Sequence, residues 1–314
     1  MHYQTKMMFK DAFLNMKSFI FNLLYFARHS QRETDLSALR NLVLSLPAEV
    51  RVHYAVECSF IETMSLDDMG AMMFPYRVVK ENRVGEVRAY IEHGFSYTLH
   101  KEKKLFFPRY FSPLETIAGY KSLIEREGLF GTGVLEKSPH CYQDKDFKVE
   151  DGDVLLDVGC AEAIFALDNI EKVAKAYLFE SESVWHKPLR LTFAPYADKT
   201  VIINKLVSDK TTRKSIRLVD AVAGEKANDA HFFVKMDIEG WERTVIEGNA
   251  EFFKSAKVKL SCCVYHRQDD AQVIEAMLKK MGYKTRFSEG WMLPTMNGIH
   301  YPYFRHGVIY AQNY

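Results

Sequence analysis

Val154-Leu-Leu-Asp-Val-Gly-Cys-Ala-Glu-Ala163 is the stretch of sequence that decides the fold. Residues 154–158 form a mainly apolar run, which is typical of a strand buried on both faces of a parallel sheet. The small residues Gly159 and Ala161 then allow a sharp turn and let a ligand approach the backbone. A helix is expected at residues 162–173, so the stretch predicts a strand–turn–helix unit with a ligand site at the end of the strand.

Further along the chain, short apolar runs continue to alternate with helical patterns. Strands are predicted at residues 176–180, 201–204, 232–237, 258–265, 283–287 and 308–311, and helices at 183–193, 241–253 and 269–281. This alternation predicts an α/β, Rossmann-like fold with a mostly parallel sheet that helices cover on both faces. No helix separates the last two strands, so we expect an antiparallel pair at the end of the domain.

The sequence is divided into two regions on the basis of this pattern. Residues 1–130 are predicted to form a mainly helical N-terminal region that either caps the site or makes a homodimer interface. Residues 131–314 are predicted to form the α/β domain, with residues 131–150 as the loop that leads into it. Residues 138–142 of that loop are expected either to lie over the ligand as a lid or to serve as a plain linker.

Composition and short apolar segments exclude several classes of protein. The formal net charge of +1 is not that of a nucleic-acid-binding protein. The apolar run at residues 18–27 is shorter than the roughly 20 residues that span a bilayer, so no stable membrane insertion is predicted. The five cysteines are odd in number and contain no C-x-x-C pair, which argues against a disulfide framework and predicts reduced thiols in the cytoplasm.

A nucleoside ligand is indicated by a second acidic position. Glu180 ends the next predicted strand, roughly 20 residues after the turn, where a carboxylate can accept both hydroxyls of a ribose. Asp157 lies just before the turn and would oppose a pyrophosphate but suit a cation, so S-adenosylmethionine is favoured over NAD as the cofactor. An NAD-dependent oxidoreductase is kept as the alternative function, and an ordinary solvated carboxylate as the alternative reading of Glu180.

A reaction centre is predicted where the fourth and fifth strands of the domain end. Asp237 and Glu239 lie in the block Lys235-Met-Asp-Ile-Glu-Gly-Trp-Glu242, and His266 ends the next strand. A histidine beside a carboxylate is a suitable general base for a hydroxyl, so these three residues are the predicted catalytic residues. No metal site is predicted; the alternatives are a divalent cation held with Glu239 or Asp269, and polar residues with a structural role alone.

Together these stretches resemble a known family over residues 151–310. The sequences Asp157-Val-Gly159, Phe179-Glu180, Ser208-Asp209, Arg217-Leu-Val-Asp220 and Lys235-Met-Asp-Ile-Glu-Gly240 with Glu242 are similar to those of FkbM-type, S-adenosylmethionine-dependent methyltransferases. The resemblance implies the seven-stranded class I methyltransferase fold and methylation of a hydroxyl on a sugar, a glycan or another small metabolite.

The resemblance also implies positions for the cofactor. Asp157, Gly159 and Glu180 are expected to hold S-adenosylmethionine, with Asp209 near the adenine and Ala161 and Ser208 beside them. The family usually keeps a further glycine in the first loop, where this sequence has alanines. A protein that keeps the fold without catalysis is therefore the third functional hypothesis.

Overall fold

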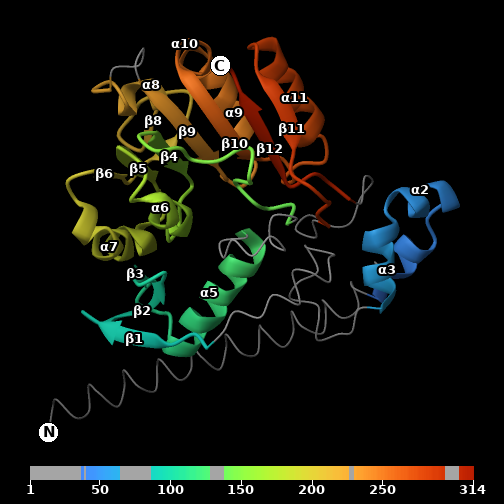
Figure 1. Ribbon diagram of the computed structural model, residues 1–314, viewed down its shortest axis with the longest axis horizontal. Coiled ribbons are helices and arrows are strands. Elements are labelled where there is room, and N and C mark those ends of the chain that lie inside the picture. Colours follow the sequence, from blue (N-terminus) through green and yellow to red (C-terminus); the bar gives the residue numbers. More distant parts are fainter. Residues whose placement is uncertain (1–36, 39, 64–85, 128–137, 226–229, 294–303) are drawn as a thin grey trace, which may run out of the picture. The chain divides into compact units, whose positions relative to one another are not determined.

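The computed structural model describes residues 37–38, 40–63, 86–127, 138–225, 230–293 and 304–314 (Figure 1). Contacts within the chain divide it into two compact units, Met1–Pro75 and Tyr76–Tyr314. The first unit contains the helices α2 (Ala48–His53) and α3 (Ala55–Thr63). The apolar run at residues 18–27 lies outside the described residues. Within the described ranges, no helix combines the length and the apolar character needed to cross a membrane.

The second unit is built around a seven-stranded sheet with the strand order β11-β12-β10-β9-β4-β5-β6 (Figure 1). Its strands are β4 (Val154–Val158), β5 (Lys175–Phe179), β6 (Thr200–Ile203), β9 (His231–Met236), β10 (Lys257–Cys263), β11 (Lys284–Phe287) and β12 (Val308–Gln312). Only β12 runs antiparallel to its neighbours in this sheet. The predicted α/β fold with seven mostly parallel strands and an antiparallel ending is confirmed.

Helices cover one face of this sheet. They are α8 (Leu218–Ala221), α9 (Glu242–Gly248), α10 (Ala250–Ser255) and α11 (Asp270–Lys280). Their apolar side chains share one buried cluster with alternate strand residues such as Leu156, Val234 and Cys262. Because successive strand residues point to opposite faces, Asp157, Lys235 and Cys263 face the other side.

The other face is covered by α6 (Ile164–Asn169) and by residues 138–149. Phe165 of α6 and Phe147 of the leading loop both pack on Phe233 of β9, with ring centroids 5.7 and 5.6 Å apart. The loop before β4 therefore closes the core of the sheet, and its polar residues lie on the same side as Lys235 and Cys263. The smaller elements of this part of the unit are α7 (Ser183–Thr192), the 3-10 helix η3 (Ala194–Tyr196), β7 (Leu206–Val207) and β8 (Ser215–Ile216).

Residues 86–127 differ from the mainly helical region predicted for residues 1–130. They form a three-stranded antiparallel sheet, β1 (Ala89–Glu92), β2 (Phe95–His100) and β3 (Lys103–Phe106), followed by the helix α5 (Pro113–Glu127). His100 is buried between the Tyr120 hydroxyl and Asp168 of α6, at 3.0 Å from each. Since β2 and α5 thus join α6, residues 86–127 belong to the same unit as the large sheet, and the boundary of the units lies earlier than the predicted one at residue 130.

Candidate active site

The turn after β4 adopts a backbone conformation that only small residues accommodate easily. Gly159, Ala161 and Ala163 all have positive φ angles, of 74°, 45° and 60°. A side-chain carbon at Gly159 would lie 2.0 Å from the backbone oxygen of Asp237. The turn therefore approaches the end of β9 so closely that only a residue without a side chain fits. The left-handed Ala163 ends the turn, and α6 therefore begins only at Ile164.

Replacing Gly159 with alanine is expected to lower the free energy of unfolding by about 2–4 kcal/mol, from overpacking and from the left-handed backbone. Gly152→Ala is the matched control, because Gly152 also has a positive φ, of 88°, but has nothing within 4 Å of the added carbon. Urea unfolding of both variants measures the difference. Equal losses of stability would show that the close approach to Asp237 has no energetic consequence.

A cavity of about 400 Å³ opens beside this turn. It is lined by Val158, Gly159, Phe179, Glu180, Ser181, Lys205, Leu206, Val207, Ser208, Lys214, Ser215, Ile238 and Trp241. Gly159, Glu180 and Ser208 were predicted to bind the cofactor and lie in its wall. Ile238 and Trp241 were missed as cavity residues, although they stand inside the Lys235–Glu242 block that was singled out.

Glu180 is fixed in the wall of this cavity by the backbone. Its Oε2 accepts the Ala161 N–H at 2.9 Å, and its Oε1 accepts the Glu182 N–H at 2.6 Å. Each carboxylate oxygen can accept more than one hydrogen bond, so the side chain keeps acceptor capacity towards the cavity. Ala161, the other predicted cofactor residue in this turn, thus contributes its N–H to positioning Glu180.

Ser208 and Asp209 follow β7 at the far side of the cavity. The Ser208 hydroxyl donates to Asp209 Oδ1 at 2.9 Å. Asp209 does not line the cavity. It packs closely against Gly248, because a side-chain carbon added at Gly248 would lie 2.5 Å from the Asp209 Cα. The predicted place of Asp209 near an adenine is not tested by these contacts.

Asp157 is fully buried and does not line the cavity. Asp157 on β4 and Lys235 on β9 are register partners in adjacent parallel strands, and Lys235 Nζ lies 3.2 Å from Asp157 Oδ1. The ammonium group also donates to the Gly159 carbonyl oxygen at 2.7 Å. Although burial favours the neutral amine, the carboxylates of Asp157 and Asp237 hold the pKa of Lys235 above its ordinary value. The direct partner of Asp157 is thus Lys235.

Two further carboxyl groups, which no motif of the sequence marks, lie near this ion pair. Glu162, in the turn after β4, is buried, and burial raises its pKa to about 7, although backbone hydrogen bonds and the charge of Lys235 act in the opposite direction. Glu127 ends α5, and burial together with the Glu162 carboxylate raises its pKa well above the ordinary value. Three carboxyl groups thus lie close enough to Lys235 to interact with its charge.

The predicted catalytic pair lies at the ends of the adjacent strands β9 and β10. His266 Nε2 is 3.4 Å from Asp237 Oδ1, and His266 Nδ1 is 3.0 Å from Oε1 of the buried Glu242. Burial lowers the pKa of His266, but the Glu242 and Asp237 carboxylates outweigh it, and the pKa is raised. Glu239 is 3.6 Å from His266 Nε2 and is exposed. The structure therefore brings Asp237, Glu239 and His266 together as predicted.

Residues of the leading loop complete this cluster. The Tyr142 hydroxyl donates to Asp237 Oδ2 at 2.7 Å, and His140 Nε2 lies 3.6 Å from the same oxygen. Burial favours the neutral acid, but the imidazoles of His140 and His266 keep the pKa of Asp237 below its ordinary value. Asp269, the alternative ligand for a divalent cation, pairs with Arg243. The loop therefore supplies polar side chains to the site, which agrees better with a functional segment than with a plain linker.

Comparisons with known proteins relate part of the chain to methyltransferases. Residues 173–285 match the model of the methyltransferase FkbM domain. No curated protein matches the chain. The solved structure of methyltransferase FkbM from Methylobacillus flagellatus KT is 18% identical, with a TM-score of 0.42 over 61% of this chain and 54% of that one. This chain thus spans about half the length of that relative.

Two other solved structures are more distant. Precorrin-6y C5,15-methyltransferase from Geobacter metallireducens GS-15 is 14% identical, with a TM-score of 0.37 over 59% of this chain and 91% of that one. An rRNA methylase from Streptococcus thermophilus is 9% identical, with a TM-score of 0.34 over 52% and 89%. The strand order and the turn after β4 are those of a Rossmann-like α/β fold, and the match over residues 173–285 relates that part of the chain to the methyltransferase FkbM domain.

Proposed function

We propose that this protein is an S-adenosylmethionine-dependent O-methyltransferase that acts on a hydroxyl of a sugar, a glycan or another small metabolite. The observation that carries the proposal is the position of the cavity beside the Asp237–His266 pair. Ile238 lines the cavity, and the residue before it, Asp237, contacts His266. A nucleoside in the cavity and a hydroxyl at the pair would therefore be neighbours.

The cavity wall fits the nucleoside part of the cofactor. Glu180 is held by two backbone N–H groups and can accept ribose hydroxyls, and Ile238 and Trp241 provide apolar surface for a base. Glu162, when it is ionised, would favour a cationic ligand end over a pyrophosphate. This charge, with the family match, favours a methyl donor over NAD.

When bound, S-adenosylmethionine supplies the sulfonium methyl group. The residues of the chain have to hold the acceptor oxygen about 3–3.5 Å from that carbon, and such positioning lowers the barrier by several kcal/mol. His266, held by Glu242 and Asp237, would take the proton of the acceptor hydroxyl. Glu239 would lie at the solvent side of the acceptor, since it is exposed while it faces His266.

Calorimetric titration with S-adenosylmethionine, followed by mass spectrometry of methyl transfer to sugars, short glycans and hydroxylated metabolites, tests the proposal. Glu180→Gln is expected to weaken binding, whereas Glu182→Gln, at an exposed side chain two residues away, should not. Binding of NAD instead would support an oxidoreductase. A folded protein that binds neither ligand would support the non-catalytic hypothesis.

Affinity for S-adenosylmethionine is expected to rise about three- to tenfold between about pH 6 and pH 8. Glu162, with a pKa of about 7, is a neutral acid at the lower pH and an anion at the higher pH, where it attracts the ammonium group of the ligand. Glu162→Gln should flatten this dependence, measured by calorimetry at both pH values. The same slope in the variant would assign the effect to another group.

A further inference from the structure

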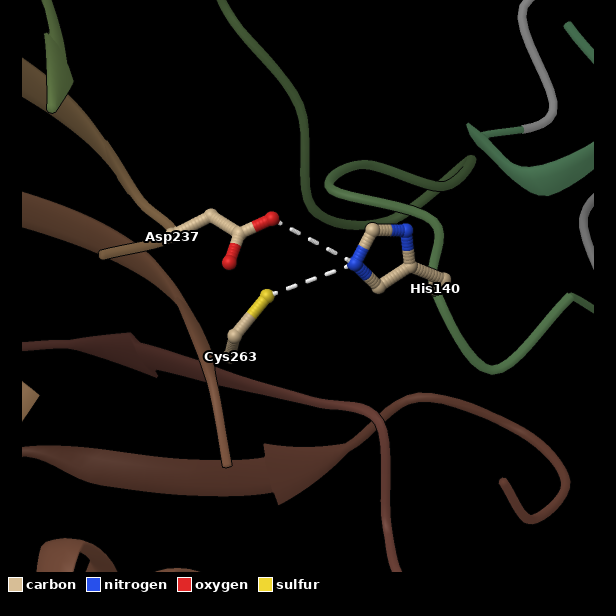
Figure 2. A group of neighbouring side chains, drawn as sticks. All are labelled: His140, Asp237 and Cys263. Atoms are coloured by element: carbon tan, nitrogen blue, oxygen red, sulfur yellow. Dashed lines mark hydrogen bonds and ion pairs between the residues drawn. The ribbon is translucent and has the colours of Figure 1, made fainter. Parts of the chain in front are cut away.

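Three potential metal ligands from separate parts of the chain meet on the loop-covered face of the sheet. His140 comes from the loop before β4, Asp237 follows β9, and Cys263 ends β10 (Figure 2). Figure 2 shows the three side chains pointing towards one another, with one ring nitrogen of His140 facing both the carboxylate and the sulfur. One nitrogen, one oxygen and one sulfur atom lie within 4.8 Å of one another.

The two distances from His140 Nε2 to its neighbours match those of a tetrahedral zinc site. Bonds of about 2.0–2.3 Å from zinc to N, O and S place neighbouring ligand atoms about 3.3–3.6 Å apart. His140 Nε2 is 3.5 Å from Cys263 Sγ and 3.6 Å from Asp237 Oδ2. A cation could therefore enter between the three atoms with little movement of their side chains.

The charges of the cluster also favour a cation. Asp237 is largely buried and Glu242 fully buried, yet within the described ranges neither forms an ion pair with a lysine or arginine. The nearby Lys235 is bound to Asp157 and to the Gly159 carbonyl. Asp237 Oδ1 makes no hydrogen bond to any residue that the structure describes, and its ion-pair partner is the imidazole of the buried His266, at 3.4 Å. A divalent cation with one thiolate and one carboxylate would be close to neutral.

We propose that His140 Nε2, an oxygen of Asp237 and Cys263 Sγ bind one zinc ion. A set of imidazole, carboxylate and thiolate ligands suits zinc better than magnesium or calcium, which prefer oxygen ligands alone. The thiol proton is released as the sulfur binds the metal. Tyr142, which donates to Asp237 Oδ2, would orient this ligand from the second layer, as outer partners do in other metal sites.

The position of the zinc suggests its use, a step that rests on the proposed function. Three protein ligands leave a fourth position for water or an acceptor hydroxyl, as in catalytic zinc sites. A hydroxyl bound there would become more acidic, and His266 lies beside Asp237 to receive its proton. Binding of the metal itself requires no methyl transfer and can be measured separately.

Metal content and cobalt spectroscopy of the full chain test the site. After dialysis against zinc sulfate and removal of loose metal, about one zinc per chain is expected by mass spectrometry. Replacement by cobalt(II) should give intense visible bands and a thiolate-to-cobalt charge-transfer band. Cys263→Ala should abolish the charge-transfer band, and both Cys263→Ala and His140→Ala should lower zinc affinity by at least about 100-fold.

Cys262→Ala is the matched control, because Cys262 lies on the same strand, is equally buried and faces the helix-covered core. It should keep the metal and the cobalt spectrum. A folded protein without zinc, or equal zinc content in the Cys263 and Cys262 variants, would overturn the proposal. Zinc binding without methyl transfer would support the metal site and argue against the proposed function. Methyl transfer by a protein that binds no zinc would support the proposed function and argue against the metal site.

Discussion

Lys235→Met is expected to destabilise the protein by about 3–5 kcal/mol, the usual effect of leaving one member of a buried ion pair without its partner. Asp157 is fully buried, and Lys235 is the cation that faces it, at 3.2 Å. The substitution also removes the hydrogen bond to the Gly159 carbonyl, which helps to hold the turn after β4. Urea unfolding measures the loss.

The double variant Asp157→Asn, Lys235→Met separates charge from packing. If the isolated carboxylate causes the loss, neutralising it should recover much of the stability, so the two single effects should not add. Lys254→Met, at an exposed position of α10, is the surface control. Additive single effects, or a Lys235→Met variant as stable as the control, would contradict the assignment of this pair as a main stabilising contact.

His266→Ala is expected to lower kcat by about 10²–10⁴-fold, the range attributed to a positioned general base. The affinity for S-adenosylmethionine should change little, because His266 does not line the cavity. The turnover is measured with an acceptor found in the screen described above, and the affinity by calorimetry. This split between turnover and binding distinguishes a role in proton transfer from a general loss of structure.

His231→Ala provides the comparison for this variant. His231 is an exposed residue at the amino end of β9, whereas the candidate site lies at the carboxyl ends of the strands. It should leave both parameters unchanged. Equal kcat values for the His266 variant and the unaltered protein would remove His266 from the mechanism, and a parallel loss of affinity would show that it helps to shape the cofactor cavity.

The large sheet could be predicted because its strands are continuous apolar runs separated by helical patterns. The small sheet β1–β3 could not be recognised in the same way, since its strands are short and do not follow the rule of apolar residues inside: β1 exposes Tyr90 and Ile91, and β2 buries Ser96, Thr98 and His100. Its second hairpin turn, Lys101-Glu102, has positive φ angles without a glycine or asparagine to signal them. The pattern thus indicated a helical region where the chain forms hairpins.

Those residues of the candidate site that lie at the ends of strands could be predicted from the sequence. Asp237 and His266 end consecutive strands, and the pairing of β9 with β10 brings them together. The bond between Lys235 and Asp157 depends on the register of β4 against β9, which the sequence does not specify. His140 and Cys263 are far apart in the chain, and only the folding of the leading loop over the sheet makes them neighbours.

The place of β12 has a consequence for the order of events during synthesis. It lies between β10 and β11, although it follows both in the chain. While the ribosome still holds residues 308–312, the nascent sheet has two unpaired edges where β12 will insert, and exposed edges of this kind promote association with other chains. Expression at lower temperature or with a chaperone that shields strand edges should therefore improve the yield of folded protein.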